Sequence, residues 1–423
     1  MRKILLASTA LLALSAVPAM AGENHDAYIL QVGGGNDSTQ YQTGWSNTAI
    51  GVQAGRHNTL AQTQDHGSAA NLAVGVQVGK GNKVTQNQGA MGEEVTETTG
   101  WFLGFPVSHD VDTDEVPVPS VASAAVAVQA GTRNEITQNQ MGALNLAAGV
   151  QVGKGNEITQ TQGTFSTETS HETVLFPPLF GATIETTTDV PNLSVGSLAG
   201  AFQFGKRNEI SQTQTGFFHE AVAVQAGKYN DATQVQAGFG HDALSLQVGK
   251  GNDATSKQFG AMNDAATVQA GAWNDAYVVQ AGYGNDAGTR QFGKGNDALT
   301  VQHGRSNESD ILQIGGNDAL VSQFGKYHDA GITQKGFANE ATILQAGYDN
   351  DGEIVQKGAF NDAYTIQRGA WNDAKQVQKG YANDALVVQA GLGNDARQIQ
   401  KGAFHDAVAV QIGAGNSSVQ IQK

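Results

Sequence analysis

The sequence predicts an all-β fold, a two-sheet β-solenoid of about fifteen 22-residue turns, from three observations. Glutamine returns every eleven residues, alternate repeat units differ in composition, and proline is excluded from the repeats. A fixed short period indicates stacked supersecondary units rather than a globular domain with scattered contacts. Each turn is expected to run strand, arc, strand, arc, and two inserts of about 30 residues are expected to leave from one edge.

The repeat is clearest from Gln225 to Gln422, with one spacing of ten residues after Gln313. Its frame is Gln-x-Gly-x-x-Asn-Asp-Ala-x-x-x-Gln, as at Gln389 to Gln400. The residues between alanine and glutamine are often Val, Ile, Thr, Leu or Tyr and alternate in character, as expected for a strand. Glycine and asparagine tolerate positive φ, so Gly-x-x-Asn is expected to form the arc.

The position two residues before each glutamine shows that one turn contains two repeat units. In the first half of the chain every second unit has glutamine there, and the units between have glycine or alanine. These glutamines are Gln40, Gln62, Gln86, Gln138, Gln160, Gln212 and Gln234, and the alternation returns at Gln376, Gln398 and Gln420. Two kinds of unit predict two facing sheets, with turns about 4.8 Å apart.

Proline lies only in the N-terminal leader and in the inserts. A proline cannot donate to a β-ladder, so its exclusion marks the repeats as strands of a continuous sheet. The predicted organisation is a signal peptide at 1–21, repeats at 22–90, a first insert at 91–121, repeats at 122–163, a second insert at 164–196 and a repeat array at 197–423.

The N-terminus has the pattern of a secretory signal peptide. Arg2 and Lys3 precede a short apolar run, and Ala19-Met20-Ala21 forms a small-x-small cleavage site. The run is too short for a membrane span. We expect a mature chain that starts at Gly22, is secreted, and has no membrane-spanning segment.

The two inserts resemble each other. Each opens with a segment rich in threonine and glutamate, continues with an aromatic-proline patch and closes with an acidic, proline-bearing run. The patches contain Trp101, Phe102, Phe105 and Pro106 in the first insert, and Phe176, Pro177, Pro178 and Phe180 in the second. Two interpretations are open: the inserts pack on each other through their aromatic residues, or they are disordered tethers.

Composition excludes several classes of partner. The net charge of -15 argues against nucleic acid and against anionic membrane surfaces. The chain has no cysteine, so it has neither disulfides nor thiolate metal sites. No phosphate-binding loop, nucleophile elbow or separate acid–base pair stands out, so we expect a protein that is not an enzyme.

Strand parity places alanine, glutamine and the arc asparagine on one face. We expect this face to be interior, because stacked identical amides can hydrogen-bond along the axis. The candidate ladder residues are Gln225, Gln236, Gln247, Gln269, Gln280, Gln389, Gln400, Gln411, Asn252, Asn274, Asn285, Asn383 and Asn394. The opposite assignment stays open, because apolar residues such as Val268 and Val388 often precede the glutamine.

An acidic residue follows the arc asparagine in most units and would form one column at each edge. Hard oxygen ligands at this spacing fit calcium. The alternative is a solvated edge that keeps the protein soluble. The candidate cation columns include Asp253, Asp264, Asp275, Asp286, Asp384 and Asp395. Histidine replaces the asparagine at His219, His241, His328 and His405, which we interpret as substitution within the arc rather than as a metal site.

The frame resembles the curlin repeat of bacterial curli subunits, for example from Gln269 through Gly271, Asn274 and Ala276 to Gln280. The resemblance covers most of the chain outside the inserts. It implies a secreted subunit of a Gram-negative bacterium that stacks into extracellular amyloid fibres for biofilm matrix, adhesion and surface colonisation. It also implies self-association, other curli-type subunits and an outer-membrane secretion pore as partners.

The chain departs from that family in three ways. It has about three times the family's usual number of repeats, its repeats start within a few residues of Gly22, and the inserts are additional. The short segment that addresses curli subunits to their pore is therefore in doubt. We expect uncapped ends that expose strand edges for templating. The rival hypothesis is a monomeric β-solenoid, an adhesin or calcium-binding surface protein that uses the inserts and the acidic columns.

Overall fold

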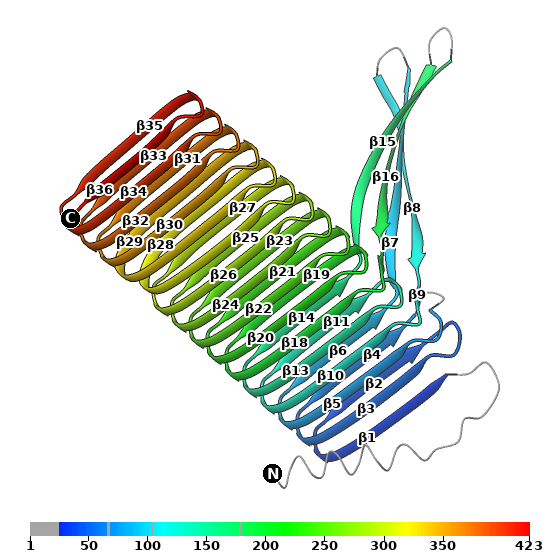
Figure 1. Ribbon diagram of the computed structural model, residues 1–423. Coiled ribbons are helices and arrows are strands. Elements are labelled where there is room, and N and C mark those ends of the chain that lie inside the picture. The colour runs from blue at the N-terminus through cyan, green and yellow to red at the C-terminus, as the bar shows by residue number, and fades with distance from the viewer. Residues whose placement is uncertain (1–24, 66–67, 103–104, 177–179) are drawn as a thin grey trace. The chain divides into compact units, whose positions relative to one another are not determined.

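The computed structural model describes residues 25–65, 68–102, 105–176 and 180–423, and its regular elements there are β-strands (Figure 1). The predicted signal peptide at 1–21 lies outside the described residues. The strands form a β-solenoid of about fifteen turns, which confirms the predicted fold class. The described part of the chain contains no helix with the length and apolar character needed to cross a bilayer.

The chain divides into two compact units. The first comprises Met1–Gly149, Thr159–Ala199 and Thr213–Phe218, and the second comprises Val150–Ile158, Gly200–Gln212 and His219–Lys423. Four strands contribute residues to both units: β13 (Leu146–Lys154), β14 (Glu157–Gln162), β18 (Leu198–Lys206) and β19 (Glu209–Phe217).

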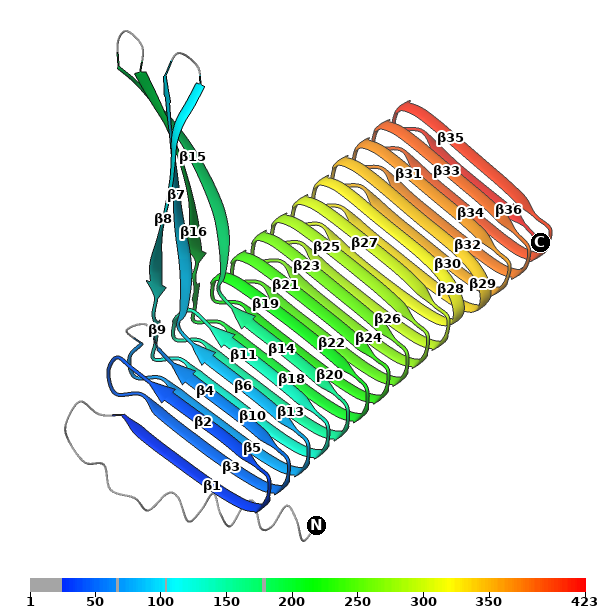
Figure 2. The same ribbon diagram turned by 180° about the vertical axis from the view of Figure 1, so that it is seen from behind.

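In the first unit, the solenoid strands pair in parallel with the equivalent strands of the next turn (Figure 2). β1 pairs with β3, for example, with Gln31 opposite Gln53. The strands are β1 (Asp26–Gly34), β2 (Asp37–Gln42), β3 (Thr48–Arg56), β4 (Thr59–Gln64), β5 (Leu72–Lys80), β6 (Lys83–Gln88), β10 (Ala124–Thr132) and β11 (Glu135–Gln140). Three two-residue strands line the arcs: β9 (Ser120–Val121), β12 (Gly142–Ala143) and β17 (Ser194–Val195).

The inserts form a separate antiparallel sheet of four strands. β7 (Ala90–Phe102) pairs with β8 (Phe105–Val118), and β15 (Thr164–Phe176) pairs with β16 (Phe180–Asn192). β16 also pairs with β7, so the two hairpins join through their backbones. The predicted contact between their aromatic side chains lies outside the described side chains.

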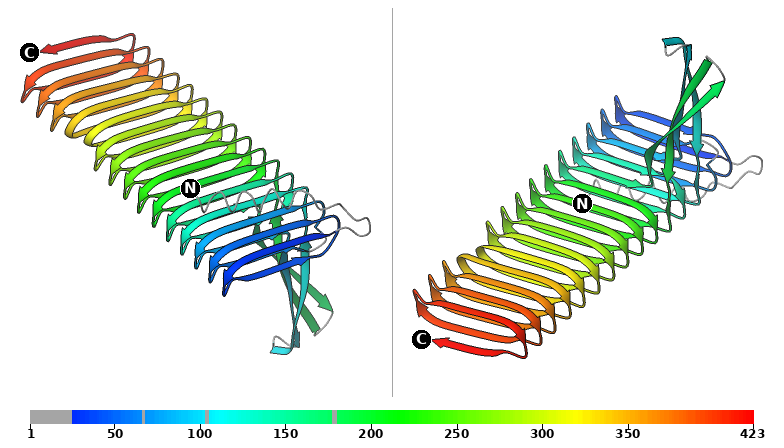
Figure 3. Two further views of the ribbon diagram at one scale, coloured as in Figure 1. Left: turned by 90° about the horizontal axis from the view of Figure 1, so that it is seen from below. Right: turned by 90° about the horizontal axis from the view of Figure 1, so that it is seen from above.

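The second unit repeats the same turn many times (Figure 3). β28 and β29 each run through an arc without a break, and the register in β28 shifts between Gly316 and Asp318, where the sequence repeat has ten residues. The strands are β20 (Glu220–Lys228), β21 (Asp231–Phe239), β22 (Asp242–Lys250), β23 (Asp253–Ala261), β24 (Asp264–Ala272), β25 (Asp275–Tyr283), β26 (Asp286–Lys294), β27 (Asp297–Arg305), β28 (Glu308–Lys326), β29 (Asp329–Tyr348), β30 (Asp351–Ala359), β31 (Asp362–Ala370), β32 (Asp373–Tyr381), β33 (Asp384–Leu392), β34 (Asp395–Ala403), β35 (Asp406–Ala414) and β36 (Ser417–Gln422).

Burial alternates along each strand with a period of two. In β21, Ala232, Gln234 and Gln236 are buried, and the residues between them are half-buried. The interior is narrow, so small side chains line much of it. Bulkier apolar side chains gather where they replace the polar residue two positions before the ladder glutamine. Ile311, Ile332 and Ile354 form such an apolar cluster with Val321 and Ile343. This pattern ties the sequence period directly to a thin two-sheet core.

The arcs correct one prediction. The arc asparagines do not adopt positive φ; the residue just before the asparagine does in the eleven-residue units, as at Gly251 (63°) and Trp273 (57°). The glycine that follows the glutamine also has positive φ, 132° at Gly271. A Cβ there would lie 1.8 Å from the carbonyl oxygen of Gly293 on the next turn, so the close stacking of arcs requires glycine.

Candidate functional site

Glutamine side chains form hydrogen-bonded ladders inside the solenoid. Nε2 of Gln225 donates to Oε1 of Gln247 at 2.7 Å, and Nε2 of Gln247 donates to Oε1 of Gln269 at 2.8 Å. The valines that precede the glutamines, such as Val224, are half-buried on the outer face. The structure places all of the predicted glutamines in these ladders: Gln225, Gln236, Gln247, Gln269, Gln280, Gln389, Gln400 and Gln411.

Each ladder glutamine also connects the two sheets. Nε2 of Gln269 lies 2.6 Å from the carbonyl oxygen of Asp253 and 2.9 Å from that of Asn274. Asp253 begins β23 in the facing sheet, whereas Gln269 lies in β24. The buried amide therefore has hydrogen-bond partners above it and across the core, which offsets the cost of burying it.

Asparagines form a second ladder in the arcs, and it runs in the opposite sense. The backbone N–H and the Nδ2 of Asn252 both donate to Oδ1 of Asn230 on the preceding turn, each at 3.2 Å. Nδ2 of Asn252 also donates to the carbonyl oxygen of Gly271. The predicted asparagines all take part in such contacts: Asn252, Asn274, Asn285, Asn383 and Asn394.

Histidines occupy the asparagine position without changing the ladder. The backbone N–H of His241 donates to Nδ1 of His219 at 3.2 Å, and the two rings stack with centroids 5.1 Å apart. Burial lowers the pKa of His241 and that of His328. These rings therefore replace the asparagine amide as hydrogen-bond acceptors.

The acidic residues lie in two columns, one at the start of each sheet's strands. Asp253 pairs in register with Asp275, and Asp264 pairs with Asp286. Burial, followed by repulsion from the neighbouring carboxylates, raises the pKa of Asp264 and Asp275. The pKa of Asp351 rises to about 6 for the same reasons, with burial again the larger cause. The columns also contain Asp384 and Asp395, which were predicted with them.

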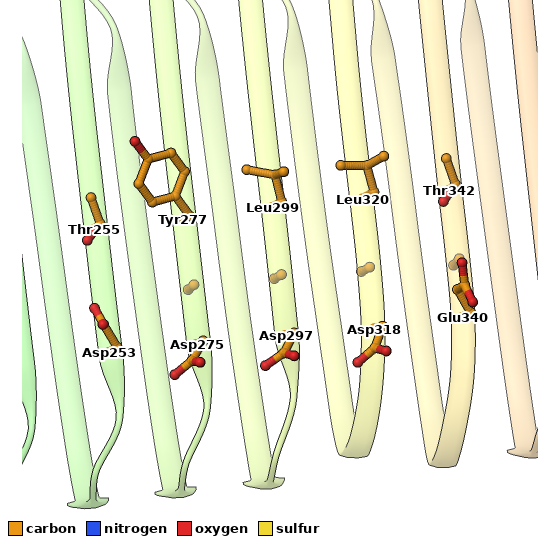
Figure 4. A pocket seen from close by; sticks show the side chains of 14 residues that line it. Asp253, Thr255, Asp275, Tyr277, Asp297, Leu299, Asp318, Leu320, Glu340 and Thr342 are labelled. Carbon is orange, nitrogen blue, oxygen red and sulfur yellow. The ribbon is translucent and has the colours of Figure 1, made fainter.

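A shallow groove follows one of these columns (Figure 4). Carboxylates form one row along the groove, and the side chains two residues further along the same strands form a parallel row, for example Tyr277 beside Asp275 and Leu299 beside Asp297. No group of three or more metal-ligating side chains with the geometry of a metal site is found among the described residues. Calcium binding by the columns stays a prediction.

Aromatic columns on the arcs were not predicted. Neighbouring rings meet edge to face at centroid distances of 5.3–6.0 Å, and Phe337 is 61% exposed. One column comprises Phe337, Phe360, Tyr381 and Phe404, and a second comprises Tyr327, Tyr348 and Trp371. Their members alternate between the first and second residues after the glycine, so a search at one fixed repeat position misses them.

Comparison with known proteins identifies the repeat. Residues 329–358 match the family model of the curlin-associated repeat, which confirms the resemblance seen in the sequence. The matched segment covers β29 and most of β30, where the glutamine ladder is continuous. No curated protein matches the chain.

Proposed function

We propose that this chain, which carries a curlin-associated repeat, is a secreted curli-type structural subunit that stacks end to end into extracellular amyloid fibres. One observation carries the proposal: the glutamine ladder repeats in register from turn to turn, as from Gln367 to Gln389 and from Gln389 to Gln411. Each turn is therefore a template for the next, whether that turn belongs to the same chain or to another.

The proposed partners follow from this mechanism. The main partner is a second copy of the chain, which adds parallel strands to an exposed sheet edge. Other curli-type subunits and an outer-membrane secretion pore are further proposed partners. The proposed location is the surface of a Gram-negative bacterium, and the proposed roles are biofilm matrix, adhesion and surface colonisation. The repeated interior is filled by ladder contacts, which supports a structural rather than an enzymatic role.

The test is a seeded aggregation assay on purified residues 22–423. Preformed fibres are added to fresh chain, growth is followed by thioflavin fluorescence, and the product is examined by fibre diffraction. We expect seeded growth and a meridional reflection near 4.7 Å. A chain that stays monomeric for days, with or without millimolar calcium, would contradict the proposal.

The acidic groove supports a second candidate, a monomeric surface protein that binds calcium along its carboxylate column (Figure 4). In that case calcium relieves the repulsion between residues such as Asp275 and Asp297. The measurement is the melting temperature of the monomer with and without calcium. A large increase favours this candidate, and an increase no greater than that given by equal ionic strength of sodium argues against it.

A further inference from the structure

The two end turns of the solenoid have matching sequences. In Figure 1, β1 and β2 lie at the end of the first unit, and β35 and β36 lie at the end of the second. Residues 25–42 and 405–422 are identical at ten of eighteen positions. The ten pairs are His25 and His405, Asp26 and Asp406, Ala27 and Ala407, Gln31 and Gln411, Gly33 and Gly413, Gly35 and Gly415, Asn36 and Asn416, Ser38 and Ser418, Gln40 and Gln420, and Gln42 and Gln422.

The end formed by β1 and β2 presents hydrogen-bond acceptors. Away from the other end, the ladder glutamines donate from Nε2 to the next turn, as Gln40 donates to Gln62. Within the described residues, the carbonyl oxygen of Gln40 therefore has no donor from a preceding turn. Oε1 of Gln40 and Oγ of Ser38 are buried and have no hydrogen-bond partner within the described residues. Ile29, whose neighbour Gly51 is buried, is 51% exposed. Within the described residues, this end therefore has polar interior atoms without a hydrogen-bond partner and an exposed apolar side chain.

The end formed by β35 and β36 presents the complementary donors. Nε2 of Gln398 donates to Oε1 of Gln420, and Nε2 of Gln420 donates only to the carbonyl oxygen of Val408 within the described residues. Gln422 is in the same situation, with one bond from Nε2 to the carbonyl oxygen of Asp406. Each amide thus has a second N–H free to donate along the axis.

The asparagine ladder of the arcs is also complementary between the two ends, but its donors and acceptors are reversed: the β1 end offers donors and the β36 end offers acceptors. The backbone N–H of Asn416 donates to Oδ1 of Asn394, which leaves Oδ1 of Asn416 facing the end. At the other end, Oδ1 of Asn36 already accepts from Asn58. Asn36 can therefore donate its backbone N–H to Asn416 of another copy. His25 can donate in the same way to His405, as His241 donates to His219.

We propose that a second copy of the chain docks with β1 on β35 and β2 on β36. This register, which rests on the proposed function, continues both ladders: Gln420 donates to Gln40 and Gln422 donates to Gln42. It also places the exposed apolar side chains of Val410 and Ile412 beside Leu30 and Val32. A second copy of the chain satisfies the donors, the acceptors and the apolar row together, and it is the occupant that we propose.

The other parallel register is disfavoured by the same side chains. If β1 docked on β36, the amide of Gln420 would face the apolar side chain of Ile29. The position above β35 would also stay empty, because β1 would take the position above β36, and no strand of the described residues pairs with β35 on its far side. A vacant strand position leaves the backbone groups of β35 unpaired, which costs free energy in a buried junction.

Cysteine cross-linking tests the register, because the chain has no cysteine of its own. Val419 and Thr39 are outward residues that would be neighbours about one strand spacing apart in the proposed junction. Val419 and Tyr28 would be neighbours in the other register. Fibres of residues 22–423 are grown from equal mixtures of Val419→Cys with Thr39→Cys, or of Val419→Cys with Tyr28→Cys, and treated with a short bismaleimide.

We expect cross-linked dimers from the first mixture and background levels from the second. Dimers from the second mixture, or fibres that give dimers from neither, would overturn the register while the proposed function stands. A failure of both mixtures and of the cysteine-free chain to form fibres would overturn the proposed function and the register with it. Each single-cysteine chain alone provides the background from lateral contacts between fibres.

A rescue experiment tests the Gln420–Gln40 contact itself. Gln420→Leu should leave Oε1 of Gln40 unpaired in the junction and slow self-seeded elongation about tenfold. Gln40→Leu added to Gln420→Leu removes both polar partners, so the double variant should elongate faster than the Gln420→Leu chain. Additive slowing by the two substitutions would contradict the contact. Circular dichroism of each soluble chain controls for misfolding.

Discussion

Nε2 of Gln269 lies 2.8 Å from Oε1 of Gln291, one turn further along the solenoid. The same Nε2 is within hydrogen-bond distance of Asp253 and Asn274 across the core. One side chain thus joins consecutive turns and both sheets. Stability of the solenoid should depend on such amides more than on the outward residues between them.

The first prediction concerns this glutamine. Gln269→Leu should lower the free energy of unfolding by about 2–3 kcal/mol, because Oε1 of Gln291 and two backbone carbonyl oxygens lose a donor in the interior. The measurement is urea unfolding of the soluble chain, followed by circular dichroism. Val268→Thr on the outer face is the matched control and should change stability by less than about 0.5 kcal/mol. Equal effects of the two substitutions would contradict an energetic role for the ladder.

The second prediction concerns the column of glycines that follow the glutamines. Gly380 has a φ of 136°, and a Cβ there would lie 1.7 Å from the carbonyl oxygen of Gly402. Gly380→Ala should therefore cost about 3 kcal/mol or more. Gly331→Ala is the control, since its nearest neighbour is Glu353 Cγ at 4.0 Å. Denaturant midpoints of the two variants give the comparison, and a mild effect at Gly380 would refute the close stacking of arcs.

The third prediction uses a reciprocal pair at one arc position. Ala382 has a φ of 51° and Gly393 a φ of 59°, each just before an arc asparagine. Ala382→Gly should stabilise the chain by about 0.5–1 kcal/mol, because a left-handed conformation costs alanine more than the added chain entropy costs glycine. Gly393→Ala should destabilise it by a similar amount, since nothing lies within 4 Å of the added Cβ. Shifts of the same sign would exclude a backbone origin.

The sequence was sufficient to predict the turn of two units, because the alternation of glutamine with glycine or alanine reports directly on facing sheets. It also located the arcs, although the left-handed residue is Trp273 rather than Asn274. Closure of the turn forces tryptophan into the left-handed conformation. The local preferences of tryptophan do not predict that conformation.

Two other features of the structure could not be predicted from the spacing of the repeat. The pairing of β16 with β7 brings together segments with no repeat frame, so only their common exit after Gln88 and Gln162 pointed to it. The aromatic column from Phe337 to Phe404 alternates between two arc positions, which hides it from a search with a fixed period. The first arises from contact between the two insert hairpins, and the second from contact between turns of the solenoid.

The last prediction is a pH dependence set by the acidic columns. Burial, and then repulsion from Asp329 and Asp373, raises the pKa of Asp351 to about 6 from its ordinary value of 3.8. Between these values the folded chain binds more protons than the unfolded chain, so stability is gained as the pH falls from about 6 toward 4 and is lost as the pH rises. Buried His241 and His328 oppose this trend, because their lowered pKa values make the folded chain less stable on acidification.

Replacement of one column carboxylate separates these contributions. Asp351→Asn should raise the free energy of unfolding at pH 7.5 by about 1 kcal/mol, a value reduced for solvent screening of a half-exposed group. Most of the gain should disappear at pH 3.5, where the aspartate is largely protonated in both states. Asp349→Asn, at an exposed arc position that also favours asparagine, is the control and should show little change. Urea unfolding of the soluble chain across pH 3.5–7.5 gives the comparison. A gain at pH 3.5 equal to that at pH 7.5 would show that the effect comes from shape or hydrogen bonding rather than from charge.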